Sequence, residues 1–258
     1  MDTNLSANTI LVTGSYRGTG LIIAQALLAE GATVLVHGLA EGQAEAACQD
    51  IGGGIPVTGD ITTTAGSDAL LEQCQPHTID VLVNNYGTAE RSTWSDSGRD
   101  EWLLAYEKNM LSAQRMIRGL LPGMIGRGHG RIINLGTVGS TRPNAQNPGY
   151  YAAKGALATA TVSLAKEVKG TGVRVNLVSP GMIATPEVID SYMKAAARKG
   201  WGDTWEAVEA HVAKDIPIGR IVRREEVANL IVFLSSPLSD GIHGQNIRID
   251  GGALDIVS

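Results

Sequence analysis

The chain has 258 residues and a net charge of −5 at pH 7, and 43% of its residues are hydrophobic. This composition is typical of a soluble globular protein that buries a full core without disulfides or metals. The negative charge and the lack of a long basic run give no attraction to nucleic acid or to a membrane surface, so we expect neither partner.

Three further features predict a location. The opening residues MDTNLSANTI lack the basic and apolar regions of a secretory leader, and no apolar run reaches the length of a membrane span. Cys48 and Cys74 lack the spacing of a zinc or redox motif. We therefore expect a cytoplasmic protein with reduced thiols and no metal site.

Short apolar strand patterns alternate with helical patterns along the chain. The predicted strands lie at 9–13, 32–37, 55–60, 79–84, 131–136, 173–179 and 245–250. The predicted helices lie at 18–30, 41–50, 64–74, 97–126, 149–169 and 224–234, with two shorter pieces within 186–213. Strands that are apolar on both faces and joined by helices predict a parallel sheet covered on both sides. No linker interrupts the pattern, so we expect one α/β domain over residues 1–258 with a doubly wound sheet.

The segment 182–216 departs from this alternation, because it inserts two short helices between two strands. Trp201, Trp205, Val208 and Val212 recur there at near-helical spacing and form one apolar stripe. Such a stripe is typical of a helix that packs on the body of the protein. A long excursion in a compact α/β domain is also typical of a mobile lid over a ligand cleft.

A glycine-rich turn over residues 13–20, TGSYRGTG, follows the first predicted strand and opens the first helix. Glycines at such a turn allow a tight reversal and close approach of a pyrophosphate, which the free amides and dipole of the helix N-terminus then bind. The spacing GxxxGxG differs from the usual GxGxxG of dinucleotide sites. Its position on the first strand-to-helix turn nevertheless favours a dinucleotide.

The end of the second predicted strand bears on which dinucleotide binds. An acid there usually accepts hydrogen bonds from the ribose hydroxyls of NAD. The chain has His37, Gly38 and Leu39 at this point, with no carboxylate, while Arg17 in the glycine turn lies where a 2′-phosphate would be expected. These features favour NADP(H) over NAD(H), although Arg17 also fits a solvated surface residue.

Tyr150 and Lys154 are four residues apart at the start of an alanine-rich helix, so both lie on one face. A nearby ammonium stabilises a phenolate and lowers the pKa of the tyrosine, which makes it a usable acid and base. Tyr151 has Gly155 in the corresponding place and lacks such a partner.

Taken together, several motifs resemble the short-chain dehydrogenase/reductase family in both residues and order. They are TGxxxGxG, the NNxG of Asn84 to Gly87, a helical Asn109, a hydroxyl residue after the fifth strand, YxxxK, PG at Pro180 and Gly181, and a terminal DGG. They run from Thr13 to Gly252, nearly the whole chain. The resemblance implies a Rossmann-type sheet of about seven parallel strands, a nicotinamide cofactor, and hydride exchange between carbonyl and alcohol.

The resemblance also implies catalytic roles. Tyr150 would be the acid and base, and Lys154 would hold the nicotinamide ribose. Thr137, and not Ser140 or Thr141, precedes Tyr150 by the interval of the family's serine. Asn109 is similar to the asparagine that ties a water into a proton relay, and a purely structural hydrogen bond is the alternative.

For the cofactor, Asp60 resembles the aspartate that binds the adenine, Thr185 the threonine that contacts the carboxamide, and Asn84 a further contact. Asp60 also fits a helix cap. The full cofactor-binding set implied is Gly14, Ser15, Arg17, Gly18, Thr19, Gly20, Asp60, Ile61, Asn84, Gly87, Tyr150, Lys154, Pro180, Gly181, Ile183 and Thr185.

Two residues depart from the family pattern. Thr137 stands where serine is usual, which keeps the hydroxyl but adds a methyl group beside the substrate. Tyr86 stands where alanine is usual, and its ring would crowd or cover the cofactor groove. Neither change removes a group that handles protons, so we expect an active enzyme.

We therefore predict an NAD(P)-dependent oxidoreductase that acts on a carbonyl or alcohol, assembled as a homotetramer as the resemblance implies. The lid residues Tyr192, Met193, Trp201 and Trp205 favour an apolar or ring-containing small molecule. One alternative is a reductase of 3-oxoacyl thioesters, which the acidic surface disfavours because acyl carriers are themselves acidic. Another is a dinucleotide-binding sensor or scaffold with little turnover.

Overall fold

A computed structural model describes residues 2–256. Its centre is a parallel sheet with the strand order β3-β2-β1-β4-β5-β6-β7. The strands are β1 Thr9–Val12, β2 Thr33–Gly38, β3 Ile55–Thr58, β4 Val81–Asn84, β5 Gly130–Leu135, β6 Val173–Pro180 and β7 Asn246–Ile249. The order reverses between β1 and β4, so the predicted doubly wound sheet of seven parallel strands is confirmed.

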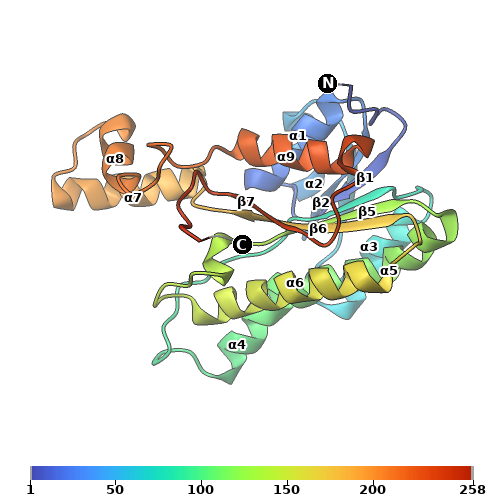
Figure 1. Cartoon of the computed structure of the whole chain (residues 1–258), viewed down its shortest axis with the longest axis horizontal. Helices are drawn as coiled ribbons and strands as arrows, with labels where there is room; N and C mark the ends of the chain where they lie inside the picture. The colour runs from blue at the N-terminus through green and yellow to red at the C-terminus, as the bar shows by residue number, and fades with distance from the viewer. Residues whose placement is uncertain (1, 257–258) are drawn as a thin grey trace.

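The helices lie on both faces of this sheet (Figure 1). They are α1 Gly18–Ala29, α2 Gln43–Asp50, α3 Thr64–Cys74, α4 Arg99–Tyr106, α5 Ser112–Arg127, α6 Pro148–Glu167, α7 Pro186–Lys199, α8 Trp205–Val212 and α9 Arg224–Ser235. A π-helical segment, η1 Glu107–Leu111, joins α4 to α5, and short 3-10 turns lie at η2 Val138–Ser140 and η3 Pro237–Ser239.

Two hydrophobic clusters form the core, one on each face. The first packs side chains of α1, α2 and α9 against β1, β2 and β4. The second packs α3, α5 and α6 against the opposite face. Strands buried on both faces explain why their sequences are continuously apolar and do not alternate.

The single helix predicted at 97–126 is interrupted in the structure. The η1 segment inserts one wide turn around Asn109 between α4 and α5. Single π turns inside helices are often found at functional sites, because they redirect one side chain and loosen the backbone hydrogen bonds.

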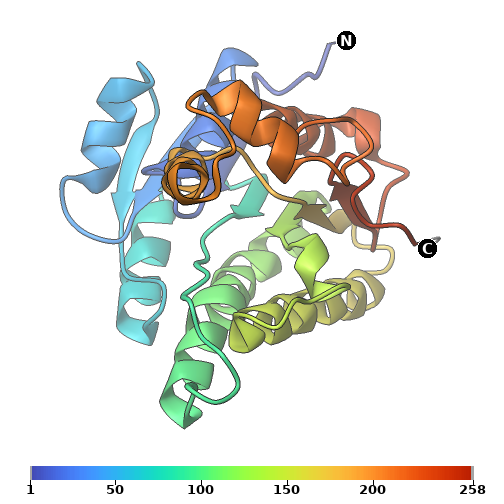
Figure 2. The same ribbon diagram turned by 90° about the vertical axis from the view of Figure 1, so that its left-hand side faces the viewer.

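The carboxyl ends of the strands share one edge, and α7 and α8 extend beyond it after β6 (Figures 1 and 2). Thr185 caps α7 by accepting from the Val188 amide, and Thr204 caps α8 by accepting from the Ala207 amide. Among residues 2–256, no helix is both long and apolar enough to cross a membrane.

Candidate active site

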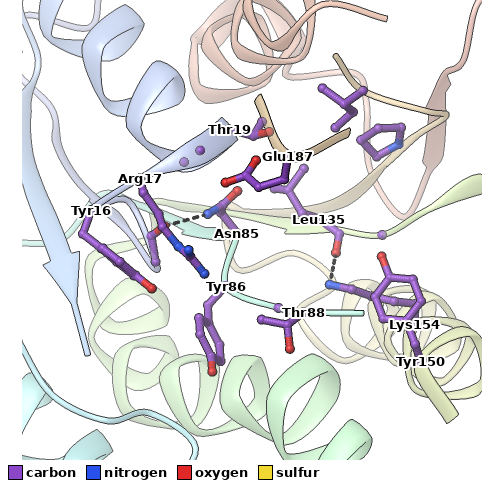
Figure 3. Close-up of a pocket in the computed structure, with 17 residues that line it drawn as sticks. Tyr16, Arg17, Thr19, Asn85, Tyr86, Thr88, Leu135, Tyr150, Lys154 and Glu187 are labelled. Carbon is purple, nitrogen blue, oxygen red and sulfur yellow. Dashed lines mark hydrogen bonds between the residues drawn. The ribbon is translucent and has the colours of Figure 1, made fainter. Parts of the chain in front are cut away.

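A cavity of about 270 Å3 opens at the carboxyl edge, beside the point where the strand order reverses (Figure 3). Ligands of doubly wound sheets bind at this point, where neighbouring loops diverge. The walls come from the glycine turn, the segment after β4, the ends of β5 and β6, the start of α6 and the start of α7. The lining residues are Gly14, Tyr16, Arg17, Gly18, Thr19, Gly20, Asn85, Tyr86, Gly87, Thr88, Leu135, Gly136, Tyr150, Lys154, Pro180, Ile183 and Glu187.

The glycine turn has the shape that a phosphate group requires. Gly14 and Gly18 have φ values of 62° and 63°, which favour glycine. A Cβ on Gly20 would lie 2.7 Å from the Gly14 carbonyl oxygen, so a side chain there would close the turn. The N-cap residue of α1, Arg17, makes no side-chain capping bond, which leaves the first amides of the helix for an anion. The turn therefore fits the pyrophosphate of a dinucleotide.

Aromatic and charged side chains line the far end of the cavity. The guanidinium of Arg17 lies 5.4 Å from the ring centroid of Tyr16. The ring of Tyr86 is within 3.2 Å of a Cβ built on Gly14, and it therefore packs on the glycine turn from the cavity side. Burial raises the pKa of Tyr86 to about 12, so its hydroxyl remains a neutral donor. Tyr86 was predicted to crowd or cover the groove, and in the structure its ring forms part of the cavity wall.

Tyr150 and Lys154 lie together at the opposite end of the cavity (Figure 3). Burial raises the pKa of Tyr150 to about 12, and the neighbouring Tyr151 adds to this, while a hydrogen bond with the Thr137 hydroxyl lowers it. The Thr137 hydroxyl thus lies close enough to act on the Tyr150 phenol, whereas the hydroxyl of Ser140 bonds to the Thr137 carbonyl oxygen at 2.7 Å. The spacing from Tyr150 predicts a carbonyl-orienting role for the same threonine.

Lys154 is 3% exposed, and its Nζ donates to the Leu135 carbonyl oxygen at 2.7 Å. Burial lowers the pKa of Lys154 to about 8. The sequence led us to expect that Lys154 lowers the pKa of Tyr150. In the structure burial dominates instead, and the pKa of Tyr150 rises.

Asn109 belongs to the π-helical segment and is 1% exposed. Its Nδ2 donates to the Thr88 carbonyl oxygen at 2.9 Å and to the Ala105 carbonyl oxygen at 3.0 Å. Its Oδ1 has no hydrogen-bond partner among the described residues. A Cβ on Gly87 would lie 2.6 Å from this Oδ1 and 2.9 Å from Lys154 Nζ, so the absent side chain keeps a gap between the two groups. Asn109 thus has a structural role and also an acceptor that faces Lys154.

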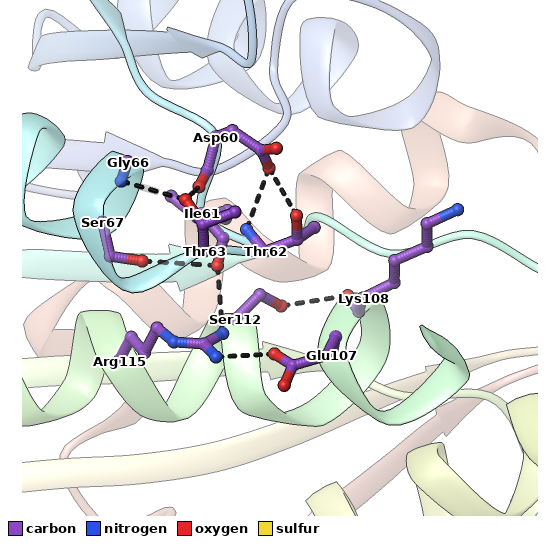
Figure 4. Close-up of polar contacts among 10 residues, drawn as sticks. All are labelled: Asp60, Ile61, Thr62, Thr63, Gly66, Ser67, Glu107, Lys108, Ser112 and Arg115. Carbon is purple, nitrogen blue, oxygen red and sulfur yellow. Dashed lines mark hydrogen bonds and ion pairs between the residues drawn. The ribbon is translucent and has the colours of Figure 1, made fainter. Parts of the chain in front are cut away.

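The Asp60 carboxylate stabilises the turn that follows β3 (Figure 4). Its Oδ1 accepts from the Thr62 amide at 3.0 Å and from the Thr62 hydroxyl at 2.7 Å. The N-cap of α3 is Thr63, whose hydroxyl accepts from the Gly66 amide at 3.0 Å. The alternative role of Asp60 as the cap of this helix is therefore wrong, because Asp60 lies three residues before the cap. The side chain of Ile61 is 1% exposed and belongs to the core.

Several predicted cofactor residues lie outside the lining of this cavity. The Ser15 hydroxyl donates to the Val12 carbonyl oxygen at 2.7 Å, and Asn84 Nδ2 donates to Asn134 Oδ1 at 2.8 Å. Thr185 serves as the cap of α7, and Gly181 packs so closely on Asp250 that a Cβ would lie 2.8 Å from that side chain. These residues support the walls from behind.

Other lining residues were not predicted from the sequence. Asn85 lines the cavity in place of Asn84, and its Nδ2 donates to the Thr13 carbonyl oxygen at 2.9 Å. The adjacent asparagines offered two candidates, and the pairing of Asn84 with Asn134 decides between them. No pattern in the sequence indicated the remaining unpredicted residues, which are Tyr16, Thr88, Leu135, Gly136 and Glu187.

Known proteins resemble the chain over nearly all of its length. A family model described as enoyl-(acyl carrier protein) reductase matches residues 14–253. An uncharacterized oxidoreductase of Bacillus subtilis, YvrD, is 34% identical, with 98% of this chain and 99% of the relative covered. The 3-oxoacyl-(acyl-carrier-protein) reductase FabG of Vibrio harveyi is 34% identical, with 96% and 98% covered.

Among solved structures, L-sorbose reductase from Gluconobacter frateurii, in complex with NADPH and L-sorbose, is 32% identical. It superposes with a TM-score of 0.91 and covers 100% of both chains. With this match over the whole fold and the family model over residues 14–253, the chain belongs to the short-chain dehydrogenase/reductase family of oxidoreductases.

Proposed function

We propose that this protein is an NADP(H)-dependent enzyme that interconverts a small polar carbonyl compound and its alcohol. The observation that carries the proposal is the cavity itself, where Tyr150 and Lys154 share one space with the glycine turn and Arg17. A bound nicotinamide supplies or accepts the hydride, and the chain positions the reactants and handles the proton.

In the direction of reduction, Tyr150 donates its proton to the carbonyl oxygen as negative charge develops there. The Thr137 hydroxyl bonds to the same oxygen and orients it toward Tyr150. In the direction of oxidation the proton returns to Tyr150, so the same phenol serves as acid and as base. The raised pKa of Tyr150 keeps the proton on the phenol until it is donated.

Lys154 supplies positive charge beside this proton transfer. Its ammonium attracts the phenolate that remains after Tyr150 has donated, which assists the step in a closed and weakly solvated site. We propose that a water in the gap above Gly87 connects Lys154 to Asn109 Oδ1 and returns the proton from solvent. The unpartnered acceptor and the missing side chain at Gly87 support this relay.

The choice of NADP(H) rests on charge at the adenine end. Arg17 lines the cavity there, and β2 ends without a carboxylate. The L-sorbose reductase that this chain resembles was solved with NADPH. We place the pyrophosphate on the amides of Gly18, Thr19 and Gly20, and the adenine near Asp60 and Ile61. Gly87, Pro180 and Ile183 line the same cavity and complete the proposed contacts, while Asn84 and Thr185 support its walls from behind.

A polar substrate fits the second hollow beside Tyr150, which measures about 90 Å3 and meets the cofactor cavity at Thr88 and Tyr150. Its other walls are Glu90, Arg91, Ser92, Ser97, Glu101, Trp102, Ala105, Lys108 and Gly149. Carboxylates, cations and two serine hydroxyls beside one indole ring suit a molecule with several hydroxyl groups. L-Sorbose, the ligand of the related reductase, belongs to this class.

The aromatic residues of segment 182–216 had favoured an apolar or ring-containing substrate. Two of them, Trp201 and Trp205, pack against neighbouring side chains instead, so they do not support an apolar substrate. Trp201 stacks on His211 with ring centroids 5.7 Å apart, and Lys199 Nζ lies 4.5 Å from the Trp201 centroid. Trp205 packs against Ala184, Ala213 and Ile221. These rings hold the two lid helices together. We propose that 182–216 acts as a lid, in which Ile183 and Glu187 face the cofactor.

A 3-oxoacyl thioester remains the second candidate substrate, and the similarity to FabG of Vibrio harveyi supports it. We further propose that residues 1–258 form a single domain. The protein would assemble from four such chains as a homotetramer in the cytoplasm. An apolar groove between α5 and α6, with Met110, Ile117, Leu121, Leu157 and Leu164 in its walls, supports the assembly. The two free thiols, Cys48 and Cys74, are compatible with a reducing compartment. Light scattering during gel filtration tests the tetramer.

The function is tested in two steps. Thermal shifts with NAD+, NADH, NADP+ and NADPH identify the cofactor, and we expect the largest shift with NADPH. Ketoses, polyols, simple ketones and a 3-oxoacyl thioester are then assayed by the absorbance of NADPH. Turnover of ketoses above the other classes supports the proposal. Preferred reduction of the thioester supports the second candidate, and binding of NADPH without turnover of any class supports a sensor.

A further inference from the structure

His37, at the end of β2, is fully buried and links two loops that face the cofactor. Its Nδ1 accepts a hydrogen bond from the Gly14 amide at 2.9 Å. Its Nε2 lies 2.8 Å from the Gly59 carbonyl oxygen, which can only accept. The two contacts therefore fix the neutral ring with its proton on Nε2. Gly14 lines the cofactor cavity, and Gly59 directly precedes Asp60.

The backbone of His37 adds further bonds to the glycine turn. Its amide donates to the Ser15 hydroxyl at 2.9 Å, and its carbonyl oxygen accepts from the Tyr16 amide at 3.2 Å. Three consecutive residues of the turn, Gly14, Ser15 and Tyr16, are thus tied to one residue of β2. The ring supplies the bond to Gly14, and it alone among these contacts also reaches the loop after β3.

The surroundings of the ring keep it neutral. Burial lowers the pKa of His37 to about 4, against the opposing effects of the Gly59 carbonyl and the Asp60 carboxylate. Asp60 is the charged group that acts on the ring among the described residues. A protonated ring would direct an N–H at the Gly14 amide, two donors facing each other, so the geometry requires the neutral form.

We infer that His37 is a positioning residue for the dinucleotide: Nδ1 of its neutral ring holds the glycine turn in place through the Gly14 amide, and the contact of Nε2 with Gly59 orients the ring. Without the Nδ1 acceptor, the buried Gly14 amide loses its partner and the turn relaxes. The loss falls on cofactor binding, because Tyr150 and Lys154 lie on α6 at the other end of the cavity.

The chain contains a matched control in His243. Its Nδ1 accepts from the Val175 amide at 3.2 Å, and its Nε2 lies 2.8 Å from the Ala165 carbonyl oxygen. It therefore makes the same pair of backbone contacts as His37. Its partners lie near the start of β6 and the end of α6, away from the residues that line the cofactor cavity. Loss of this ring is expected to reduce stability and leave cofactor binding unchanged.

The test compares His37→Asn, His37→Gln and His243→Gln in the full chain. An asparagine Oδ1 can take the place of Nδ1 and accept from Gly14, whereas glutamine places its amide near Nε2. We expect His37→Gln to raise the Kd of NADPH about tenfold or more, equivalent to ~1.4 kcal/mol. His37→Asn should stay within about threefold of the parent, and His243→Gln should not change the Kd.

The KM for NADPH should follow the Kd, while kcat at saturating NADPH stays within about twofold, a split that a general loss of stability would not produce. Equal Kd values for the two His37 variants would overturn the inference. An equal rise in Kd for His243→Gln would overturn it as well. If neither His37 variant folds while His243→Gln does, His37 is a determinant of folding and the positioning role is rejected.

Discussion

Lys154 Nζ donates to the Leu135 carbonyl oxygen at 2.7 Å, and this bond joins helix α6 to the end of β5. The contact directs the ammonium into the cofactor cavity but leaves it with one protein acceptor for three donors. The side chain is 3% exposed, so its remaining donors depend on the ligands that the cavity receives. Burial of this charge lowers the stability of the folded state, whereas an apolar side chain at the same position would not.

Replacement of Lys154 by methionine should therefore separate stability from activity. The pKa of Lys154 falls from 10.5 to about 8 on folding, so the folded state binds this proton less readily than the unfolded state. The free energy of unfolding is therefore highest above pH 10.5, where the amine is neutral in both states, and it decreases as the pH falls toward 8. The Lys154→Met variant has no ionisable group at this position and does not lose stability in this way. We expect its Tm to exceed the parent's by more at pH 7 than at pH 10, with about 2–4 °C for each kcal/mol.

The same variant should lose at least about 100-fold in kcat/KM, since the charge beside Tyr150 is gone. Melting curves at the two pH values and one rate assay are sufficient. A Tm advantage that does not depend on pH would show that the buried charge has no energetic cost, and the account of Lys154 would be wrong.

Tyr150→Phe tests the proton donor directly. Removal of the hydroxyl should lower kcat by about 100-fold to 10,000-fold, the range for loss of a general acid. The Kd of NADPH should stay nearly constant, because the glycine turn and Arg17 are untouched. Tyr151→Phe is the matched control, and it should retain most of the activity. If the two variants were equally active, Tyr150 would not be the acid.

Much of the fold could be predicted from residue patterns alone. The strands are continuous apolar runs because both faces of the sheet are covered, and the glycine turn follows directly from β1. The π-helical segment escaped prediction, because no residue pattern marks it; in the structure Asn109 within it bonds to the Thr88 and Ala105 carbonyl oxygens. Spacing within one helix also placed Tyr150 and Lys154 on one face of α6, and both line the same cavity in the structure.

The sequence was less informative where distant segments meet. The adjacent Asn84 and Asn85 are chemically alike, and only the neighbour Asn134 on β5 draws one of them inward. We expected Lys154 to lower the pKa of Tyr150, yet burial raises it, and burial depends on segments that are distant in the sequence. From the sequence, His37 showed only that no acid stands at the end of the second strand. In the structure its ring contacts two loops, through Gly14 and Gly59.

In the proposed mechanism Thr137 orients the substrate oxygen through a hydroxyl that also accepts from the Gly139 amide at 3.1 Å. Thr137→Ala should lower kcat/KM by about 100-fold, comparable to the loss of one oxyanion donor. Thr137→Ser keeps the hydroxyl and should stay within about threefold of the parent with the best small substrate. An alanine variant as active as the serine variant would contradict this role.

Arg17 should discriminate between the two nicotinamide cofactors. Arg17→Ala is expected to raise the Kd of NADPH about tenfold or more and leave that of NADH nearly unchanged, since a charge-assisted bond to a phosphate is worth ~1.5–3 kcal/mol. Arg91→Ala provides the control, because Arg91 lines only the second hollow. Isothermal titration gives both constants. Equal losses for the two cofactors would place Arg17 on the pyrophosphate.

Tyr151 holds the turn that carries Thr137, although its hydroxyl takes no part in the proposed chemistry. Its ring fills the space beside Gly139, where any Cβ would overlap it, and its hydroxyl accepts from Asn144 Nδ2 at 3.0 Å. The ring therefore fixes the η2 turn against α6, and Thr137 with it. Tyr151→Ala should lower kcat/KM about tenfold, whereas Tyr151→Phe keeps the ring and should lose less than about threefold.

A second substitution tests whether the contact with Gly139 is the cause. Gly139→Ala forces the turn away from the ring and should impair the enzyme by itself. If the two residues act through one contact, the double variant Gly139→Ala/Tyr151→Ala should be more active than the product of the single effects predicts, because the alanine at 139 then has room. Steady-state kinetics of the four proteins completes the cycle. Strictly multiplicative losses would mean that Tyr151 acts on catalysis by another route.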